Sequence, residues 1–206
     1  QGGIVKGFVV KGAAADTSRK QLDEHTTFVK AYGLGGLLWG KVAGAEVTGP
    51  LGKAIPDLAR FLAATGAVEG DLVLVGAGAA RHVNPGLGRL RVQVAKERSL
   101  IPEGFAFTWI VDFPAFEWDE GAQRWFAAHH PFTKPKDEHR ALLEAGRMAE
   151  IKADAYDLVC NGMEVGGGSI RIHRADLQQL LFQTLGIGPE EQRNKFGFLL
   201  DALAFG

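Results

Sequence analysis

The 206-residue chain predicts a mixed α+β protein in two parts. Segments of strand-like and helix-like hydrophobic spacing alternate through the first hundred residues, which is typical of a small α/β module. The composition changes after Pro102, because three of the four tryptophans follow at positions 109, 118 and 125. Further on, Asn161-Gly162 separates two apolar segments, the usual sequence of a β-hairpin turn. We therefore place a domain boundary near residue 103, with one domain over residues 1–103 and another over 104–206.

The first domain is expected to hold at least three strands and two helices. Ser18 and Gln21 have the spacing of a capping box, which predicts a helix that begins there and stops at Gly33. A second helix is expected over residues 51–64, and strands over residues 4–10, 37–41 and 71–75.

Two segments of this domain allow more than one interpretation. Residues 87–98 alternate as a strand does, but their leucines and Val94 also fit a helix. Gly76 and Gly78 follow an apolar strand, as in a dinucleotide-binding loop, but the third glycine of that fingerprint is missing. A tight turn made possible by glycine explains the pair better, and a nucleotide-binding protein remains the alternative.

The second domain is expected to contain strands and helices in several segments. The aromatic and β-branched content of residues 105–111 predicts a buried strand. Residues 124–129 predict another strand, on which His129 and His130 would point to opposite faces, so at most one of them could serve a given site. Helices are expected over residues 137–148, 174–185 and 189–205.

The hairpin around Asn161-Gly162 brings two acidic residues together. A two-residue turn places Val159 opposite Glu164 and Asp157 opposite Gly166. Asp157 and Glu164 then share a face, roughly 7–8 Å apart along the diagonal. Two carboxylates at this spacing can bind one Mg²⁺ ion that also binds nucleotide phosphates. The alternative is that both face a solvated groove and bind nothing.

Arg171 follows Glu164 by seven residues, which places the two on opposite faces of a regular strand. A bulge in the glycine run 166–168 would return Arg171 to the face of Glu164. There its guanidinium could bind a carboxylate through two hydrogen bonds. The alternative is a structural ion pair with Glu164 or Asp176.

Composition and charge exclude several classes of protein. Apolar residues make up 46% of the chain and the net charge is −1, which excludes intrinsic disorder and a basic field over the whole protein. A local basic cluster remains, and it consists of Arg81, Arg89, Arg91, Lys96 and Arg98. Such a cluster is more often a solvated face than a nucleic-acid surface. The single cysteine, Cys160, cannot form an internal disulfide, and no apolar run reaches the ~20 residues of a membrane span. We expect a cytoplasmic protein without membrane contact.

Four sequence strings then identify a resemblance. FTWIVDFPAFEWDE, HHPFTKP, AYDLVCNGMEVGGGSIRIH and EEQRNKFGFLLDALAFG together resemble the bacterial-type aspartyl-tRNA synthetases in order and spacing. Residues 1 to about 100 resemble the GAD insertion domain of that family, which also occurs in a subunit of tRNA-dependent amidotransferases. The resemblance implies the C-terminal part of a class II catalytic domain with an antiparallel sheet, and it favours a helix over residues 87–98.

The resemblance also implies an activity and site residues. Members of the family form homodimers, activate L-aspartate with ATP and transfer it to tRNA(Asp). By their places in the strings, His129 and Arg171 correspond to residues that bind L-aspartate, with Arg171 on its side-chain carboxylate. Glu164 corresponds to an ATP and Mg²⁺ residue, and Asp157 to the second Mg²⁺ ligand.

Several parts of the family pattern have no counterpart in the sequence. These are the anticodon-binding OB domain and motifs 1, 2 and 3, including two arginines that bind the nucleotide. Because positioning and charge stabilisation supply most of the rate in such reactions, we expect this polypeptide alone to form no adenylate. The alternative function is a non-catalytic GAD module that binds tRNA or a protein.

Overall fold

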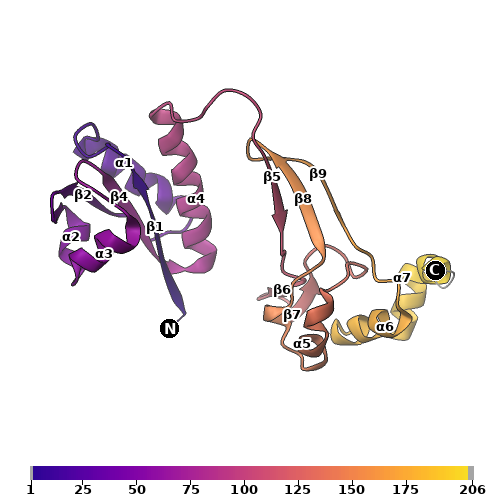
Figure 1. The fold of residues 1–206 in the computed structure, drawn as a ribbon. Coiled ribbons are helices and arrows are strands. Elements are labelled where there is room, and N and C mark those ends of the chain that lie inside the picture. Colours follow the sequence, from indigo (N-terminus) through magenta and orange to yellow (C-terminus); the bar gives the residue numbers. More distant parts are fainter. Residues whose placement is uncertain (1, 204–206) are drawn as a thin grey trace. The chain divides into compact units, whose positions relative to one another are not determined.

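The computed structural model describes residues 2–203 (Figure 1). The chain divides into two compact units, with the boundary along the sequence between Glu103 and Gly104. The first unit contains β1 (Gly3–Val10), α1 (Arg19–Lys30), β2 (Leu38–Ala43), β3 (Glu46–Thr48), α2 (Pro50–Ala54), α3 (Leu58–Thr65), β4 (Leu72–Ala79) and α4 (Ala80–Glu97). The second contains β5 (Phe107–Val111), β6 (Phe116–Asp119), β7 (Arg124–Ala127), η1 (Asp137–His139), α5 (Arg140–Glu144), η2 (Met148–Glu150), β8 (Ala155–Cys160), β9 (Met163–Ser169), α6 (Ala175–Thr184) and α7 (Pro189–Leu203). The combination of helices and antiparallel sheets confirms the α+β class. No helix within residues 2–203 is long and apolar enough to cross a membrane.

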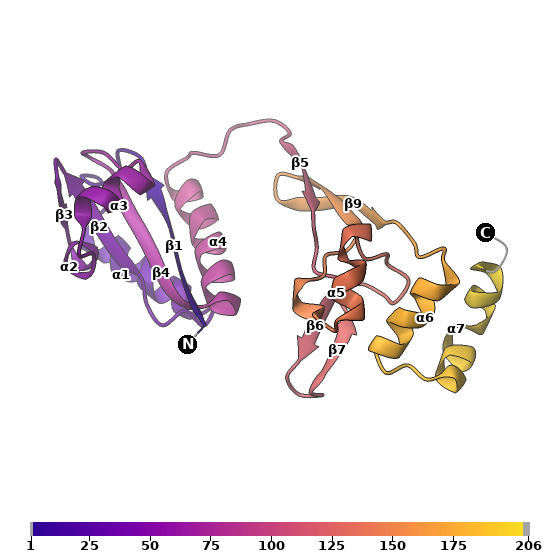
Figure 2. The same cartoon turned by 60° about the horizontal axis from the view of Figure 1, so that its bottom comes forward.

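The first unit is an antiparallel sheet with helices on both faces. Its strand order is β1-β4-β2-β3. The central strand β4 alternates between two cores, since successive side chains point to opposite faces. Leu72 and Leu74 pack with α1 and α4, whereas Val73 and Val75 pack with α2 and α3. Figure 2 shows α1 and α3 on the two sides of β4.

Two sequence predictions in this unit are confirmed at atomic level. The capping box closes because Ser18 Oγ accepts the N–H of Gln21 at 3.3 Å and Gln21 Oε1 accepts the N–H of Ser18 at 2.8 Å. Residues 87–97 are helical, as part of α4, and Leu87, Leu90 and Val94 are all buried. Helical spacing brings these three apolar side chains to one face, where they pack into the core.

The single helix expected over residues 51–64 is wrong. It is divided into α2 and α3, and Pro56 lies between them. A proline disfavours helical backbone in the residue before it, and Ile55 is accordingly extended, with φ −98° and ψ 113°. The second helix then begins at Asp57, whose side chain accepts the N–H of Arg60 at 2.9 Å.

The tight turn expected at Gly76 and Gly78 is also wrong. Both glycines lie within β4, opposite Lys6 and Ile4 of β1. A Cβ atom on Gly76 would lie 2.8 Å from a methyl group of Leu34, so a larger residue there would require Leu34 to shift. Since β4 belongs to an antiparallel sheet, the βαβ context of a dinucleotide-binding loop is missing as well.

The second unit holds the three-stranded antiparallel sheet β5-β8-β9 and the separate pair β6-β7. The buried strand expected over residues 105–111 is present as β5, but its burial is wrong. Phe107, Trp109 and Val111 are exposed by 62%, 59% and 57%. Aromatic and β-branched residues favour a strand, whereas burial depends on what packs against the sheet, and β5 is an edge strand.

Other elements of this unit differ from the prediction in their limits. The helix expected over residues 137–148 is replaced by η1, α5 and η2, because Gly146 adopts a left-handed φ of 69°. Strand β7 ends at Ala127, so His129 and His130 lie beyond it and the strand does not set their directions. Helices α6 and α7 confirm the two predicted C-terminal helices, although residues 204 and 205 lie outside the described part of the chain.

Candidate functional site

The hairpin β8-β9 forms as the Asn-Gly signal predicts. Asn161 and Gly162 both have positive φ, 51° and 82°, as a type I′ turn requires. Val159 lies opposite Glu164, and Cys160 lies opposite Met163. Asn161 also fixes the hairpin to the segment that precedes β5, since its Oδ1 accepts the N–H of Ala106 at 2.9 Å.

A bulge lies in β9, closer to the turn than the glycine run. Leu158 pairs with Gly166 while Val159 pairs with Glu164, so Val165 is the extra residue. Asp157 consequently faces Gly167 instead of the predicted Gly166. The extra residue shifts the alternation by one, as was expected of a bulge between Glu164 and Arg171.

Asp157 and Glu164 converge above Gly167. A Cβ atom on Gly167 would overlap Asp157 Oδ1 and lie 3.1 Å from Glu164 Oε1. The missing side chain therefore leaves the space in which the two carboxylates meet. Neither carboxylate has an ion-pair partner among residues 2–203, so their charges are available to a cation.

The residues present fit a divalent cation whose remaining ligands are supplied mostly by water and substrate. Two carboxylate oxygens from facing strands are a typical protein contribution to Mg²⁺ bound with nucleotide phosphates. The described residues contain no cluster of three or more His, Cys, Asp or Glu side chains that could enclose a metal without such help.

Arg171 follows β9 on the same side as Ser169. Its Nη1 donates to Ser169 Oγ at 2.9 Å and lies 3.4 Å from His130 Nδ1. No carboxylate in residues 2–203 pairs with it. The structural ion pair considered from sequence is wrong, because Asp176 pairs with Arg174 and Arg140 at 2.9 and 3.1 Å and Glu164 remains unpaired.

The segment around Phe132 holds Arg171 in place. Thr133 forms an antiparallel bridge with Arg171, and the backbone N–H of Ile172 donates to Phe132 O at 2.9 Å. The ring of Phe132 packs edge-on against Phe182 and Phe196, with centroids 5.8 and 5.3 Å away. The arginine thus extends from backbone that is anchored to the helical part of the unit.

A hollow of about 300 Å³ opens beside the guanidinium. It is lined by Arg171, His130, Phe132 and Leu199. One cationic group at the edge of a partly apolar hollow suits a small ligand that carries a carboxylate.

The structure brings His130 to this hollow, whereas His129 packs edge-on against Phe113 at 5.2 Å. Burial lowers the pKa of His130, and the charges of Arg171 and His129 lower it further. The N–H of Phe132 donates to His130 Nδ1 at 3.2 Å, which is consistent with a neutral ring protonated on Nε2. Sequence reasoning left open which of the two histidines could serve the site, and the family resemblance favoured His129. It missed Ser169, although the alternation beyond a bulge could have assigned Ser169 to the face of Arg171.

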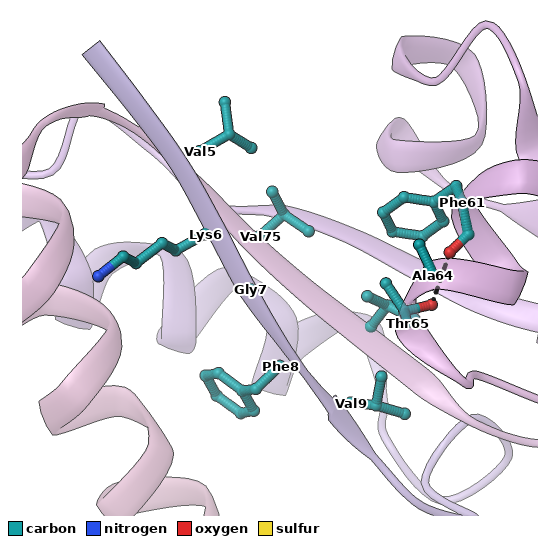
Figure 3. A pocket seen from close by; sticks show the side chains of 10 residues that line it. Val5, Lys6, Gly7, Phe8, Val9, Phe61, Ala64, Thr65 and Val75 are labelled. Atoms are coloured by element: carbon teal, nitrogen blue, oxygen red, sulfur yellow. Dashed lines mark hydrogen bonds between the residues drawn. The ribbon is translucent and has the colours of Figure 1, made fainter. Parts of the chain in front are cut away.

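The first unit contains a different kind of cavity. A hollow of about 450 Å³ lies between β1 and α3. Figure 3 shows that Val5, Val9, Val75 and Phe61 lie on one side of β1 while Lys6 extends to the other. Apart from Lys6, the lining of the hollow has no ionisable side chain. This hollow therefore offers no acid–base or metal chemistry, and the candidate site is in the second unit.

Comparisons with known proteins place the chain in one family. The family of class II tRNA synthetases (D, K and N) matches residues 21–206. The aspartate–tRNA ligase of Leuconostoc citreum (strain KM20) is 45% identical over 208 residues, and that of Streptococcus pneumoniae serotype 19F (strain G54) is 47% identical over 204 residues. The matches cover 100% and 98% of this chain but 35% of each relative. Because the family match spans residues 21–206, which is most of the chain, the chain belongs to the class II tRNA synthetases of the D, K and N group.

Proposed function

We propose that the chain supplies part of the aspartate and ATP sites of an aspartate–tRNA ligase. The observation that carries this proposal is the arrangement of charge on one face of the hairpin. Two unpaired carboxylates, Asp157 and Glu164, converge there, and an arginine without a carboxylate partner, Arg171, follows strand β9 two residues after its end. An anionic amino acid and a nucleotide with its cation require groups of these two kinds.

Arg171 binds the side-chain carboxylate of L-aspartate in this proposal. Ser169 holds one of its nitrogens, which leaves the others free to donate to the substrate. His129 contacts the bound amino acid, as the family resemblance suggests. A neutral His130 adds no positive charge that would attract other anions, so the guanidinium dominates recognition.

Glu164 and Asp157 hold Mg²⁺ together with the phosphates of ATP. The bound cation would neutralise phosphate charge while the aspartate carboxylate attacks the α-phosphorus and pyrophosphate leaves. The two carboxylates contribute position, because facing strands fix their separation. Gly167 contributes space, since a side chain there would displace Asp157.

At the level of the whole enzyme we propose tRNA(Asp) as the acceptor, a homodimer as the assembly and the cytoplasm as the location. The first unit would be a GAD-type insertion domain over residues 1–103, and the second the C-terminal part of the class II catalytic domain over 104–206. The names of the relatives support tRNA and aspartate as partners.

Replacing Arg171 in a full-length ligase that contains this segment tests the proposal. We expect Arg171→Leu to raise the KM for aspartate by ~100-fold with little change in the KM for ATP, because the variant loses one partner of a charge pair. Aspartate-dependent pyrophosphate exchange measures both constants. Arg174→Leu is the matched control, since Arg174 is paired with Asp176. An unchanged KM for aspartate in Arg171→Leu would remove this arginine from the site.

A further inference from the structure

The near-neutral chain divides into two units of opposite charge. Residues 1–103 contain 13 Lys and Arg against 9 Asp and Glu, a net charge of +4 with neutral histidines. Residues 104–206 contain 10 Lys and Arg against 15 Asp and Glu, a net charge of −5. A basic surface on the first unit is therefore hidden in the overall charge of −1.

Helix α4 carries the densest part of this positive charge. Arg89, Arg91 and Lys96 are exposed, and none has an ion-pair partner among residues 2–203. The acidic residue of α4, Glu97, is occupied by His25 Nε2 at 2.7 Å and by Gln93 at 2.8 Å. The positive charge on the outer face of the helix is thus not cancelled by the helix itself.

The three side chains border an open strip along α4. At about 100° per residue, Arg89 and Lys96 lie on one side of the exposed face and Arg91 lies on the other. Gly88 and Val92 lie between them, and a Cβ atom on Gly88 would meet nothing within 4 Å. Arg89 and Lys96 are separated by roughly 10 Å along the axis, a length over which one strand of a duplex carries about three phosphates.

A fourth cation extends this strip toward the start of the helix. Lys6 of β1 is exposed, and its Nζ donates to Asn84 of α4 at 2.8 Å. It has no carboxylate partner in the described residues. Two other lysines of the unit are neutralised locally, since Lys11 pairs with Asp71 at 2.9 Å and Lys20 with Glu24 at 3.9 Å.

We propose that this α4 strip, formed by Lys6, Arg89, Arg91 and Lys96, binds the phosphate backbone of the tRNA. The inference rests on the proposed function for the identity of the RNA and extends it to a surface of the first unit that the aspartate and ATP sites do not use. Arginines with free donors bind phosphate oxygens through paired hydrogen bonds, and no base-reading groups are needed.

The binding experiment uses the 206-residue chain and an unmodified tRNA(Asp) transcript. Fluorescence anisotropy measures Kd from 50 to 200 mM salt for the chain, for R89Q/R91Q/K96Q and for the charge-matched control K30Q/K53Q/R60Q. The control removes three exposed cations of α1, α2 and α3 that also have no ion-pair partner in residues 2–203. Glutamine is a good helix former, so α4 should fold in the strip variant.

We expect the strip variant to bind at least 10-fold more weakly at 50 mM salt and to lose about three units from the slope of log K against log salt. The control should weaken binding less than threefold and keep its slope. Equal losses in both variants, or no binding by the unaltered chain, would overturn the proposal.

A second outcome would also contradict it. The competing occupant of the basic strip is the acidic second unit of another copy. Salt-sensitive dimers of the chain that the strip variant abolishes, with unchanged RNA binding, would assign the strip to self-association. Failure of the proposed ligase function is distinguishable, since aspartate-dependent pyrophosphate exchange requires no tRNA and the anisotropy measurement requires no adenylate.

Discussion

Gly167 constrains where the two carboxylates of the candidate site can lie more strictly than any charged residue does. Charged side chains can reach a common point from several backbone positions because they are long. The space above Gly167 exists only because that residue has no side chain, and both carboxylates use it. A search limited to ionisable residues would have missed this contribution. The sequence shows three consecutive glycines, but only the pairing with Asp157 distinguishes the second of them.

Replacing this glycine should impair the cation site without unfolding the hairpin. In a full-length ligase that contains the segment, we expect Gly167→Ala to lower aspartate-dependent pyrophosphate exchange by ~10-fold or more and to raise the Mg²⁺ concentration required, because the added methyl group displaces Asp157. Gly166→Ala is the control, since its Cβ would meet no atom within 4 Å. Equal activity of the two variants would argue against convergence of the carboxylates above Gly167.

At the scale of elements, the junction between β1 and β4 depends on one buried carboxylate. Asp71 precedes β4 and accepts hydrogen bonds from Lys11 Nζ, the N–H of Gly12 and the N–H of Val68, all at 2.9 Å. Burial acts to raise the pKa of Asp71, but the three hydrogen bonds outweigh it and hold the pKa below its usual value. The carboxylate therefore joins the end of β1 to the turn that leads into β4.

Asp71→Asn should lower the free energy of unfolding of the first unit by about 2 kcal/mol at neutral pH, because an amide cannot accept all of these hydrogen bonds. Since the folded pKa is depressed, the stabilisation is complete above the unfolded pKa of about 3.9 and is lost as the pH falls through the folded pKa. The difference between the original chain and the variant should therefore shrink below about pH 4. Urea unfolding followed through the amide resonances of β4 measures it.

The control for this experiment is Asp23→Asn. Asp23 is exposed and pairs with Arg19 one helical turn away, at 3.1 Å, so its loss should cost less than about 0.5 kcal/mol. A difference for Asp71→Asn that is as large at pH 3 as at pH 7 would contradict the role of the ionised carboxylate.

The sequence predicted an element correctly where the interactions that form it join residues close together in the chain. The capping box at Ser18 and the turn at Asn161-Gly162 depend on neighbours within three residues, and both formed as expected. Pro56 is a local signal too, and it divides the single helix that the hydrophobic spacing around it predicts. The exposure of β5 could not be predicted, because burial depends on whether distant segments of the chain pack against the strand. The contact between His130 and Arg171 joins residues 41 positions apart and required the fold.

At the scale of the whole molecule, the chain consists of two units: the first has one sheet between two cores, and the second has two sheets and a core of its own. Every residue from Ser99 to Asp112 is exposed, so the connection between the units and the first strand after it carry little packing. The second unit also presents Phe107, Trp109 and Tyr156 on one face of its sheet, opposite the face that carries Asp157. Chemistry and apolar surface thus lie on opposite sides of the same strands.

The connection should be the first site of proteolysis. We expect a glutamate-specific protease to cleave after Glu103 before any other position, because cleavage requires exposed backbone without stable pairing. Intact-mass measurement over a time course would show two fragments of 103 residues each. Earlier cleavage within α1, after the exposed Glu24, would show instead that the first unit opens more readily than the connection.

The surplus residue at Val165 also determines how this ribbon tolerates changes of length. Successive side chains of a regular strand point to opposite faces, so deleting one residue moves every side chain beyond it to the other face. Deleting Val165 would instead leave Glu164 opposite Val159 and Gly167 opposite Asp157, with Arg171 still on their side. Deleting Leu158 from β8, which has no residue to spare, would turn Asp157 away from Glu164. The two strands of one hairpin therefore differ in the deletions they tolerate: losing one residue preserves the site in β9 but disrupts it in β8.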